Sequence, residues 1–111
     1  METQRQERIA RLLQKEMGEI FLLYAKNIHG TIISVSNVRI TPDLSIAYVY
    51  LSIFPSEKAQ NVLSEIQEKS REFRFELGKR VRHQLRIVPE LQFFVDDTLD
   101  YLENIDKLLK K

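Results

Sequence analysis

The hydrophobic positions change period several times along this 111-residue chain. Up to about Lys26, apolar residues recur at intervals of three and four, which predicts an amphipathic helix with one buried face. Thr3 and Gln6 form the pattern of a capping box, in which a hydroxyl and an amide satisfy free N–H groups at a helix start. The helix should stop near Gly30, which can adopt the positive φ that a helix exit often needs. Its predicted buried residues are Ile9, Leu12, Leu13, Met17, Ile20, Phe21 and Tyr24.

From residue 31 the period shortens to that of a strand. Residues 31–40 are rich in β-branched side chains and roughly alternate between apolar and polar, which predicts a β-strand. The apolar phase slips between Val35 and Val38, and a bulge near Ser36 and Asn37 would explain the slip.

A turn should follow at Pro42–Asp43, because proline presets the φ angle of a first central turn position. Residues 45–54 alternate again, which predicts a second strand that forms an antiparallel hairpin with the first. Tyr48 and Tyr50 should share one face of this strand. The other face should carry Ala47, Val49, Leu51 and Ile53.

The second half of the chain is predicted to be mainly helical. Ser56 is the predicted N-cap of a helix that carries Ala59, Val62, Leu63 and Ile66. A further helical segment carries Phe73, Leu77, Val81 and Leu85 and ends before Pro89. Residues 91–95 form a third strand. Asp97 or Thr98 caps a last helix with an apolar stripe made of Leu99, Leu102, Ile105, Leu108 and Leu109.

The predicted order is therefore α-β-β-α-α-β-α in a single domain over residues 3–111. Three strands with helices on one face make an α+β architecture. The chain has no cysteine, which excludes disulfides, thiolate chemistry and cysteine-based zinc sites. Neither a transmembrane run of apolar residues nor a secretory signal pattern is present, so we expect a cytoplasmic protein with no membrane association.

Enzymatic chemistry finds little support in the sequence. His29 and His83 lie far apart and have no serine or cysteine context that would make a catalytic triad. Asp96 and Asp97 could in principle bind Mg²⁺ or transfer protons, but adjacent acids at a helix start more commonly serve as a cap. Glycine-rich phosphate-binding motifs are absent. We expect a non-enzymatic protein that needs no cofactor and no metal.

The formal net charge of +1 conceals a strong separation of charge. Residues 71–86 hold six basic and two acidic side chains, whereas residues 96–106 hold five acidic side chains and no basic one. On a helical wheel most of the basic side chains lie opposite the apolar stripe, with an aromatic ring among them. Such a patch can contact phosphates and stack on bases. The predicted RNA-binding residues are Arg71, Arg74, Phe75, Lys79, Arg80, Arg82 and Arg86.

Two other interpretations of this basic segment stay open. It can be an ordinary solvated helix face, on which Glu72 and Glu76 pair with arginines one turn away, because charge runs are common on helices. Alternatively, the protein is an interaction module whose basic helix meets an acidic protein partner.

Longer motifs resemble the ribosome-binding factor A family. The first is the hairpin signature VRITPDLSIAYVYLS at residues 38–52. The others are LGKRVR at residues 77–82, LRIVPELQF at residues 85–93 and DDTL at residues 96–99. They follow the family's order at matching spacing, and the resemblance covers about residues 5–109.

This resemblance implies a KH-like fold of type II, with the order α-β-β-α-α-β and a three-stranded sheet covered by helices. It implies an assembly factor that binds the free small (30S) ribosomal subunit and assists late processing of 16S rRNA, especially near its 5′ end. A small ribosomal GTPase would be a functional partner, and the protein would support growth in the cold. We expect it to be a monomer.

The sequence departs from the pattern where the second and third helices should meet. Ordinary KH domains clamp the nucleic-acid backbone with a Gly-x-x-Gly loop, but no glycine occurs between Gly30 and Gly78. The family's usual Ala-x-Gly kink is replaced here by Lys69-Ser70-Arg71. Either the two helices meet through Ser70 in another geometry, or the helix bends less.

Overall fold

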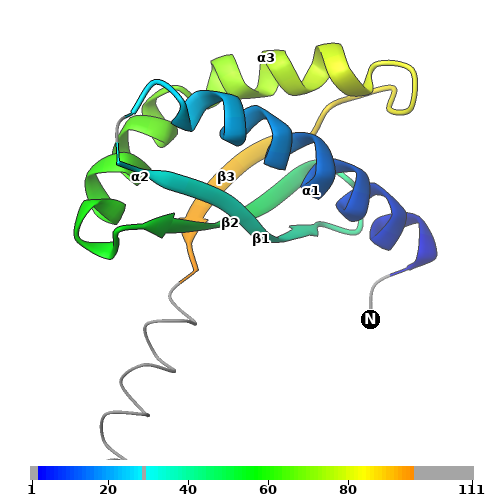
Figure 1. The fold of residues 1–111 in the computed structure, drawn as a ribbon. Coiled ribbons are helices and arrows are strands. Elements are labelled where there is room, and N and C mark those ends of the chain that lie inside the picture. Colours follow the sequence, from blue (N-terminus) through cyan, green and yellow to red (C-terminus); the bar gives the residue numbers. More distant parts are fainter. Residues whose placement is uncertain (1–2, 29, 97–111) are drawn as a thin grey trace, which may run out of the picture.

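The computed structural model describes residues 3–28 and 30–96, which form a three-stranded sheet with three helices on one of its faces (Figure 1). The elements are α1 (Gln4–Ala25), β1 (Ile32–Ile40), β2 (Ile46–Phe54), a short 3₁₀ turn η1 (Ser56–Lys58), α2 (Ala59–Glu68), α3 (Ser70–Val81) and β3 (Glu90–Val95). The order α-β-β-α-α-β confirms the predicted α+β class. The predicted last helix, with its cap at Asp97 or Thr98, lies outside the described residues.

The sheet has the order β1-β2-β3, so that β2 is the central strand. β1 and β2 are antiparallel and β2 and β3 are parallel, with the two crossover helices lying between the parallel strands in sequence. The register of the hairpin shifts between Val35 and Asn37, which confirms the predicted bulge at Ser36. A parallel pair needs a long crossover connection, which is usually helical, and this crossover carries α3 over the sheet.

The hydrophobic core lies between the helices and one face of the sheet. The predicted faces of β2 are confirmed, because Ala47, Val49, Leu51 and Ile53 are buried while the tyrosines point the other way. The centre is aromatic: the ring of Phe21 from α1 lies 4.8 Å from that of Phe73 in α3 and 5.8 Å from that of Phe93 in β3, between centroids. This cluster fixes α3 against α1 and the sheet.

The predicted capping box is present at the start of α1. The Gln6 backbone N–H donates to the Thr3 hydroxyl at 3.1 Å, and the Thr3 N–H donates to the Gln6 side-chain oxygen at 2.9 Å. The Gln6 amide nitrogen also donates to the carbonyl of Ile40 at 3.1 Å, and the side chain is buried. One residue therefore caps a helix and ties it to the end of β1.

The hairpin turn is organised by Asp43. One of its carboxylate oxygens accepts hydrogen bonds from the hydroxyls of Thr41 and Ser45, each at 2.7 Å, and from the Ser45 backbone N–H at 3.1 Å. These donors, the Ser45 hydroxyl first, lower the pKa of Asp43 below its ordinary value of 3.8. The predicted turn at Pro42–Asp43 is confirmed by the hydrogen bond from the Leu44 N–H to the Thr41 carbonyl.

Two predicted helix boundaries are wrong. Ser56 is not an N-cap: it opens the 3₁₀ turn, α2 begins at Ala59, and Lys58 at the N-cap makes no side-chain capping bond. The third helix does not reach Leu85, because it ends at Val81. Leu85 still packs against the core from the following loop. Its apolar side chain therefore continues the helical spacing in the sequence although the residue is not in the helix.

The junction between α2 and α3 is a single residue, Lys69, with φ of −97° and ψ of 15°. A negative φ is open to any L-residue, so the chain turns here without the glycine that the family pattern supplies. Ser70 opens α3, and its hydroxyl lies 3.4 Å from the carbonyl of Leu91, to which it donates. The two helices therefore meet at Lys69, one residue before the predicted position. In the described part of the chain, no helix is long and apolar enough to cross a membrane.

Candidate nucleic-acid interface

A groove of about 590 Å³ runs along the outer side of α3 and brings together five of the seven predicted site residues. Its positions recur at intervals of three and four, so they lie on one face of the helix. The groove is lined by four basic and three uncharged residues, and no acidic residue lines it. The lining residues are Arg71, Arg74, Phe75, Gly78, Lys79, Arg82 and Val88.

Phe75 forms the aromatic part of this groove, and 66% of its surface is exposed. The ammonium of Lys79 lies 5.0 Å from the centroid of the ring, within the range of a cation–π contact. The same ammonium is 3.0 Å from a carboxylate oxygen of Glu76 one turn earlier. Lys79 is thus held beside the ring at a solvent-exposed position, where it stays accessible to an anion.

Arg74 lines the groove and also makes two hydrogen bonds to the backbone of the loop after α3. Its Nε donates to the carbonyl of Pro89 at 3.2 Å, and one terminal nitrogen donates to the carbonyl of Val88 at 2.7 Å. These bonds hold the loop after α3 against the helix, so that Val88 becomes part of the groove wall.

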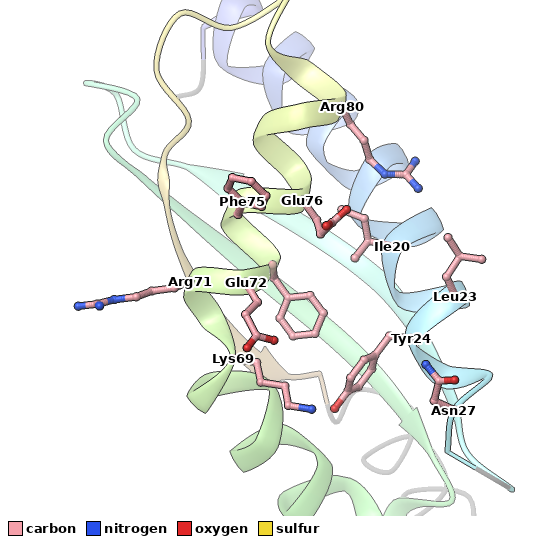
Figure 2. Close-up of a pocket in the computed structure, with 11 residues that line it drawn as sticks. Ile20, Leu23, Tyr24, Asn27, Lys69, Arg71, Glu72, Phe75, Glu76 and Arg80 are labelled. Atoms are coloured by element: carbon pink, nitrogen blue, oxygen red, sulfur yellow. The ribbon is translucent and has the colours of Figure 1, made fainter.

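Arg80 lies on the other side of α3. Its guanidinium contacts the carboxylate of Glu19 in α1 at 2.7 Å, with 28% of the Arg80 side chain and 51% of the Glu19 side chain exposed. Figure 2 shows Arg80 directed toward α1. This pair joins two helices, and Arg80 does not line the groove.

Arg82 and Arg86 are separated by the end of the helix. Arg82 is the C-cap of α3 and lines the groove, whereas Arg86 is exposed in the loop and is not among the lining residues. The prediction that residues 71–86 share one helix is therefore wrong beyond Arg82, because the backbone leaves the helix there. His83 is exposed in the same loop.

A larger cavity of about 750 Å³ lies between α1 and α3 (Figure 2). Glu72 and Glu76 line it together with Arg71 and Arg80, so its charge is mixed. In Figure 2 Arg71 extends away from α1, whereas Glu76 lies between α3 and α1. The cavity facing α1 is therefore lined by both acids and bases of α3, whereas no acid lines the smaller groove. A polyanion is better matched by the smaller, uniformly basic groove.

A third, smaller cavity of about 250 Å³ lies at the free edge of β3 and was not predicted. Its residues are Gln67, Ser70, Leu91, Gln92, Phe93 and Phe94. The Gln67 amide donates to the carbonyl of Phe93 at 3.2 Å, as Ser70 does to Leu91. Nothing in the sequence pattern links these positions, because the cavity depends on how α2 and α3 cross the strand.

The chain matches the family model described as ribosome-binding factor A over residues 5–109. It belongs to the ribosome-binding factor A family. Two relatives of that name are the protein of Christiangramia forsetii, 47% identical over 98% of this chain and 85% of its own, and that of Cytophaga hutchinsonii, 45% identical over 100% of this chain and 84% of its own.

Solved structures of family members share the fold. The crystal structure of ribosome-binding factor A from Thermus thermophilus aligns with a TM-score of 0.66 at 24% identity, covering 81% of this chain and 94% of that one. A second Thermus thermophilus structure is a homology model fitted into the cryo-EM map of a 30S–RbfA complex. It aligns with a TM-score of 0.62 at 26% identity, over 77% and 88%. The KH-like fold inferred from the motifs is confirmed.

Proposed function

We propose that this protein is a non-catalytic, RNA-binding assembly factor that binds the free 30S subunit and assists late maturation of 16S rRNA near its 5′ end. The observation that carries the proposal is the groove on α3, which is lined by four cations and an exposed aromatic ring and by no carboxylate, although Glu76 pairs with Lys79 at its margin. Membership of the ribosome-binding factor A family supports it. So does the relative from Thermus thermophilus, whose homology model was fitted into the cryo-EM map of a 30S–RbfA complex.

The groove suits an extended polyanion better than a small one. From Arg71 to Arg82 the helix advances by eleven residues, or about 16 Å at 1.5 Å per residue. Its cations are spread along this length rather than focused on one point. A phosphate backbone laid along α3 can therefore meet several of them, while Phe75 offers a surface on which a base can stack.

The predicted residues take unequal shares in this proposal. Arg71, Lys79 and Arg82 carry the phosphate contacts, since they line the groove at exposed positions. Arg74 and Arg80 already donate to protein acceptors, so each has fewer donors for RNA. Lys79 also has a protein partner, Glu76, but an ammonium has three donors and this pair is exposed to solvent. Arg86 extends the basic surface beyond the helix. These contacts position the protein, and the shape of the immature rRNA supplies specificity.

The family resemblance extends the proposal to the cellular setting. The protein would act in the cytoplasm as a monomer, would be released before translation, and would work together with a small ribosomal GTPase. Residues 3–111 would form its one RNA-binding domain. It would require no cofactor.

Charge reversal at the groove tests the proposal. The double variant Arg71→Glu and Arg82→Glu should lose binding to purified 30S subunits while its thermal unfolding stays unchanged, because both side chains are exposed. The matched control is Arg8→Glu with Arg11→Glu, which changes the net charge equally on exposed positions of α1. Equal loss in both double variants would mean that bulk charge alone acts, and binding by the groove variant would contradict the proposal.

The same variants separate RNA from a protein partner. If the groove variant loses subunit binding but binds naked 16S rRNA as the wild type does, the groove contacts an acidic protein surface. Loss of both is the result that the RNA proposal requires.

A further inference from the structure

The face of the sheet opposite the helices carries a cluster of three aromatic rings. Tyr48 and Tyr50 come from β2 and Phe94 from β3, across the parallel pair of strands. The Phe94 ring is stacked on that of Tyr50 with centroids 5.5 Å apart, and it lies 6.0 Å from that of Tyr48. Phe94 is 39% exposed, and the described helices all lie on the other side of the sheet (Figure 1).

Polar side chains flank these rings at the same level of the sheet. Arg39 and Gln92 are the neighbours of Tyr48 across β1 and β3, and Asn37 is the neighbour of Tyr50 across β1. All three are exposed. A guanidinium and two carboxamides beside aromatic rings supply the donors and acceptors that base edges and phosphates use.

The edge cavity of β3 links this cluster to the start of α3, which also carries the basic groove. The cavity at the free edge of β3 is lined both by Ser70, which precedes the groove residue Arg71 in the chain, and by Phe94. Phe94 therefore takes part both in this edge cavity and in the ring cluster. A single-stranded RNA whose phosphates lie on α3 can pass over the edge of β3 and bring its next bases to Phe94 and Tyr50.

We propose that the open sheet face is a second RNA contact, on which unpaired bases stack against Phe94, Tyr50 and Tyr48. The path from the groove rests on the function proposed above, but the stacking makes its own prediction. Binding at this face depends on bases and not on phosphates alone, because an aromatic ring contacts the base.

The test compares a short single-stranded oligoadenylate with an abasic ribose-phosphate strand of the same length. The wild type should bind the oligoadenylate at least about fivefold more tightly, the lower end of what one stacked base contributes. The double variant Tyr50→Leu with Phe94→Leu should lose most of this preference and keep its affinity for the abasic strand. Tyr50→Phe is the matched control, since it keeps the ring and should keep the preference.

Four outcomes would overturn the inference. Equal affinity of the wild type for both strands would mean that phosphate contacts alone act. A preference that the double variant keeps in full would mean that bases stack elsewhere, as on Phe75 of the groove. If the wild type bound neither the oligoadenylate nor the abasic strand, the proposed contact at the sheet face would be refuted, whatever the 30S experiment shows for the groove. In the free full-length protein, nuclear Overhauser contacts between the Phe94 ring and methyl groups of residues 97–111 would assign this face to the chain's own C-terminal residues.

Discussion

The guanidinium of Arg74 donates to the backbone carbonyl of Val88 at 2.7 Å and so fastens the loop after α3 to the helix that carries the groove. A second bond, to the carbonyl of Pro89, comes from the same side chain. Arg74 thus holds the groove wall in place, whereas Arg71 and Arg82 on the same face present their charges in the groove.

Replacing Arg74 should therefore cost stability. Arg74→Ala leaves the carbonyls of Val88 and Pro89 without this donor, and we expect a loss of about 1–2 kcal/mol in the free energy of unfolding. Arg74→Lys should lose a similar amount, because one ammonium cannot reproduce the forked geometry. Urea unfolding checks both variants. A lysine variant as stable as the wild type would show that the loop is not held by these bonds.

Arg80 and Glu19 should be coupled only weakly. Half of the Glu19 side chain is exposed, so solvent screens the pair and the coupling energy should be about 0.5 kcal/mol. A double-mutant cycle with Arg80→Ala and Glu19→Ala, measured by urea unfolding at low and high salt, gives this energy. A coupling above about 2 kcal/mol would contradict the exposed geometry.

Gly78 lies inside α3 with no conformational need for glycine. A Cβ there would meet the nearest Val88 methyl at 3.5 Å, an ordinary contact, so Gly78→Ala should stabilise the protein by about 0.5–1 kcal/mol. Gly18→Ala in α1 is the matched control, where nothing lies within 4 Å. Both variants should melt at a higher temperature. If Gly78→Ala alone lowered the stability, α3 and the Val88 loop would be packed more tightly than the 3.5 Å contact indicates.

Asp43 should contribute a pH-dependent part of the stability. Its pKa is lowered in the folded state, so its contribution is complete above the ordinary value of 3.8 and is lost as the pH falls through the lowered pKa. Asp43→Asn keeps an acceptor oxygen but does not titrate. Between about pH 4 and pH 2 the wild type should lose stability faster than this variant. Parallel losses in denaturation series over that range would contradict the geometry of the turn.

Arg82 should contribute to the salt dependence of RNA binding. Each phosphate contact on a single strand adds about −0.7 to the slope of log affinity against log salt, so Arg82→Gln should make the slope shallower by about that amount. Arg8→Gln on α1 should leave it unchanged. Anisotropy titrations of single-stranded RNA at several salt concentrations measure both slopes. An unchanged slope in Arg82→Gln would remove this residue from the interface.

Much of the fold is visible in the sequence because its signals are local. The capping box of Thr3 and Gln6, the bulge at Ser36 and the alternation around Tyr48 each involve neighbours in the chain, and each was predicted. The end of α3 was missed because Leu85 continues the apolar period. Its burial comes from a loop that Arg74 holds in place, which is a long-range contact.

The site divides in the same way. Helical periodicity brings Arg71 and Phe75 to one side of α3, so the core of the groove could be predicted. Whether a given arginine is accessible depends on partners far away in the chain, as with Arg80 and Glu19. The pairing of Phe94 with Tyr50 depends on the parallel register of β2 and β3, which no local pattern encodes.

The central claim is tested most directly by sedimentation of tagged protein from a cell lysate through gradients that separate free 30S, 50S and 70S particles. We expect co-migration with free 30S alone at low salt, and its loss at high salt, because phosphate contacts release counterions. Protein that stays at the top of the gradient even at low salt would contradict the account.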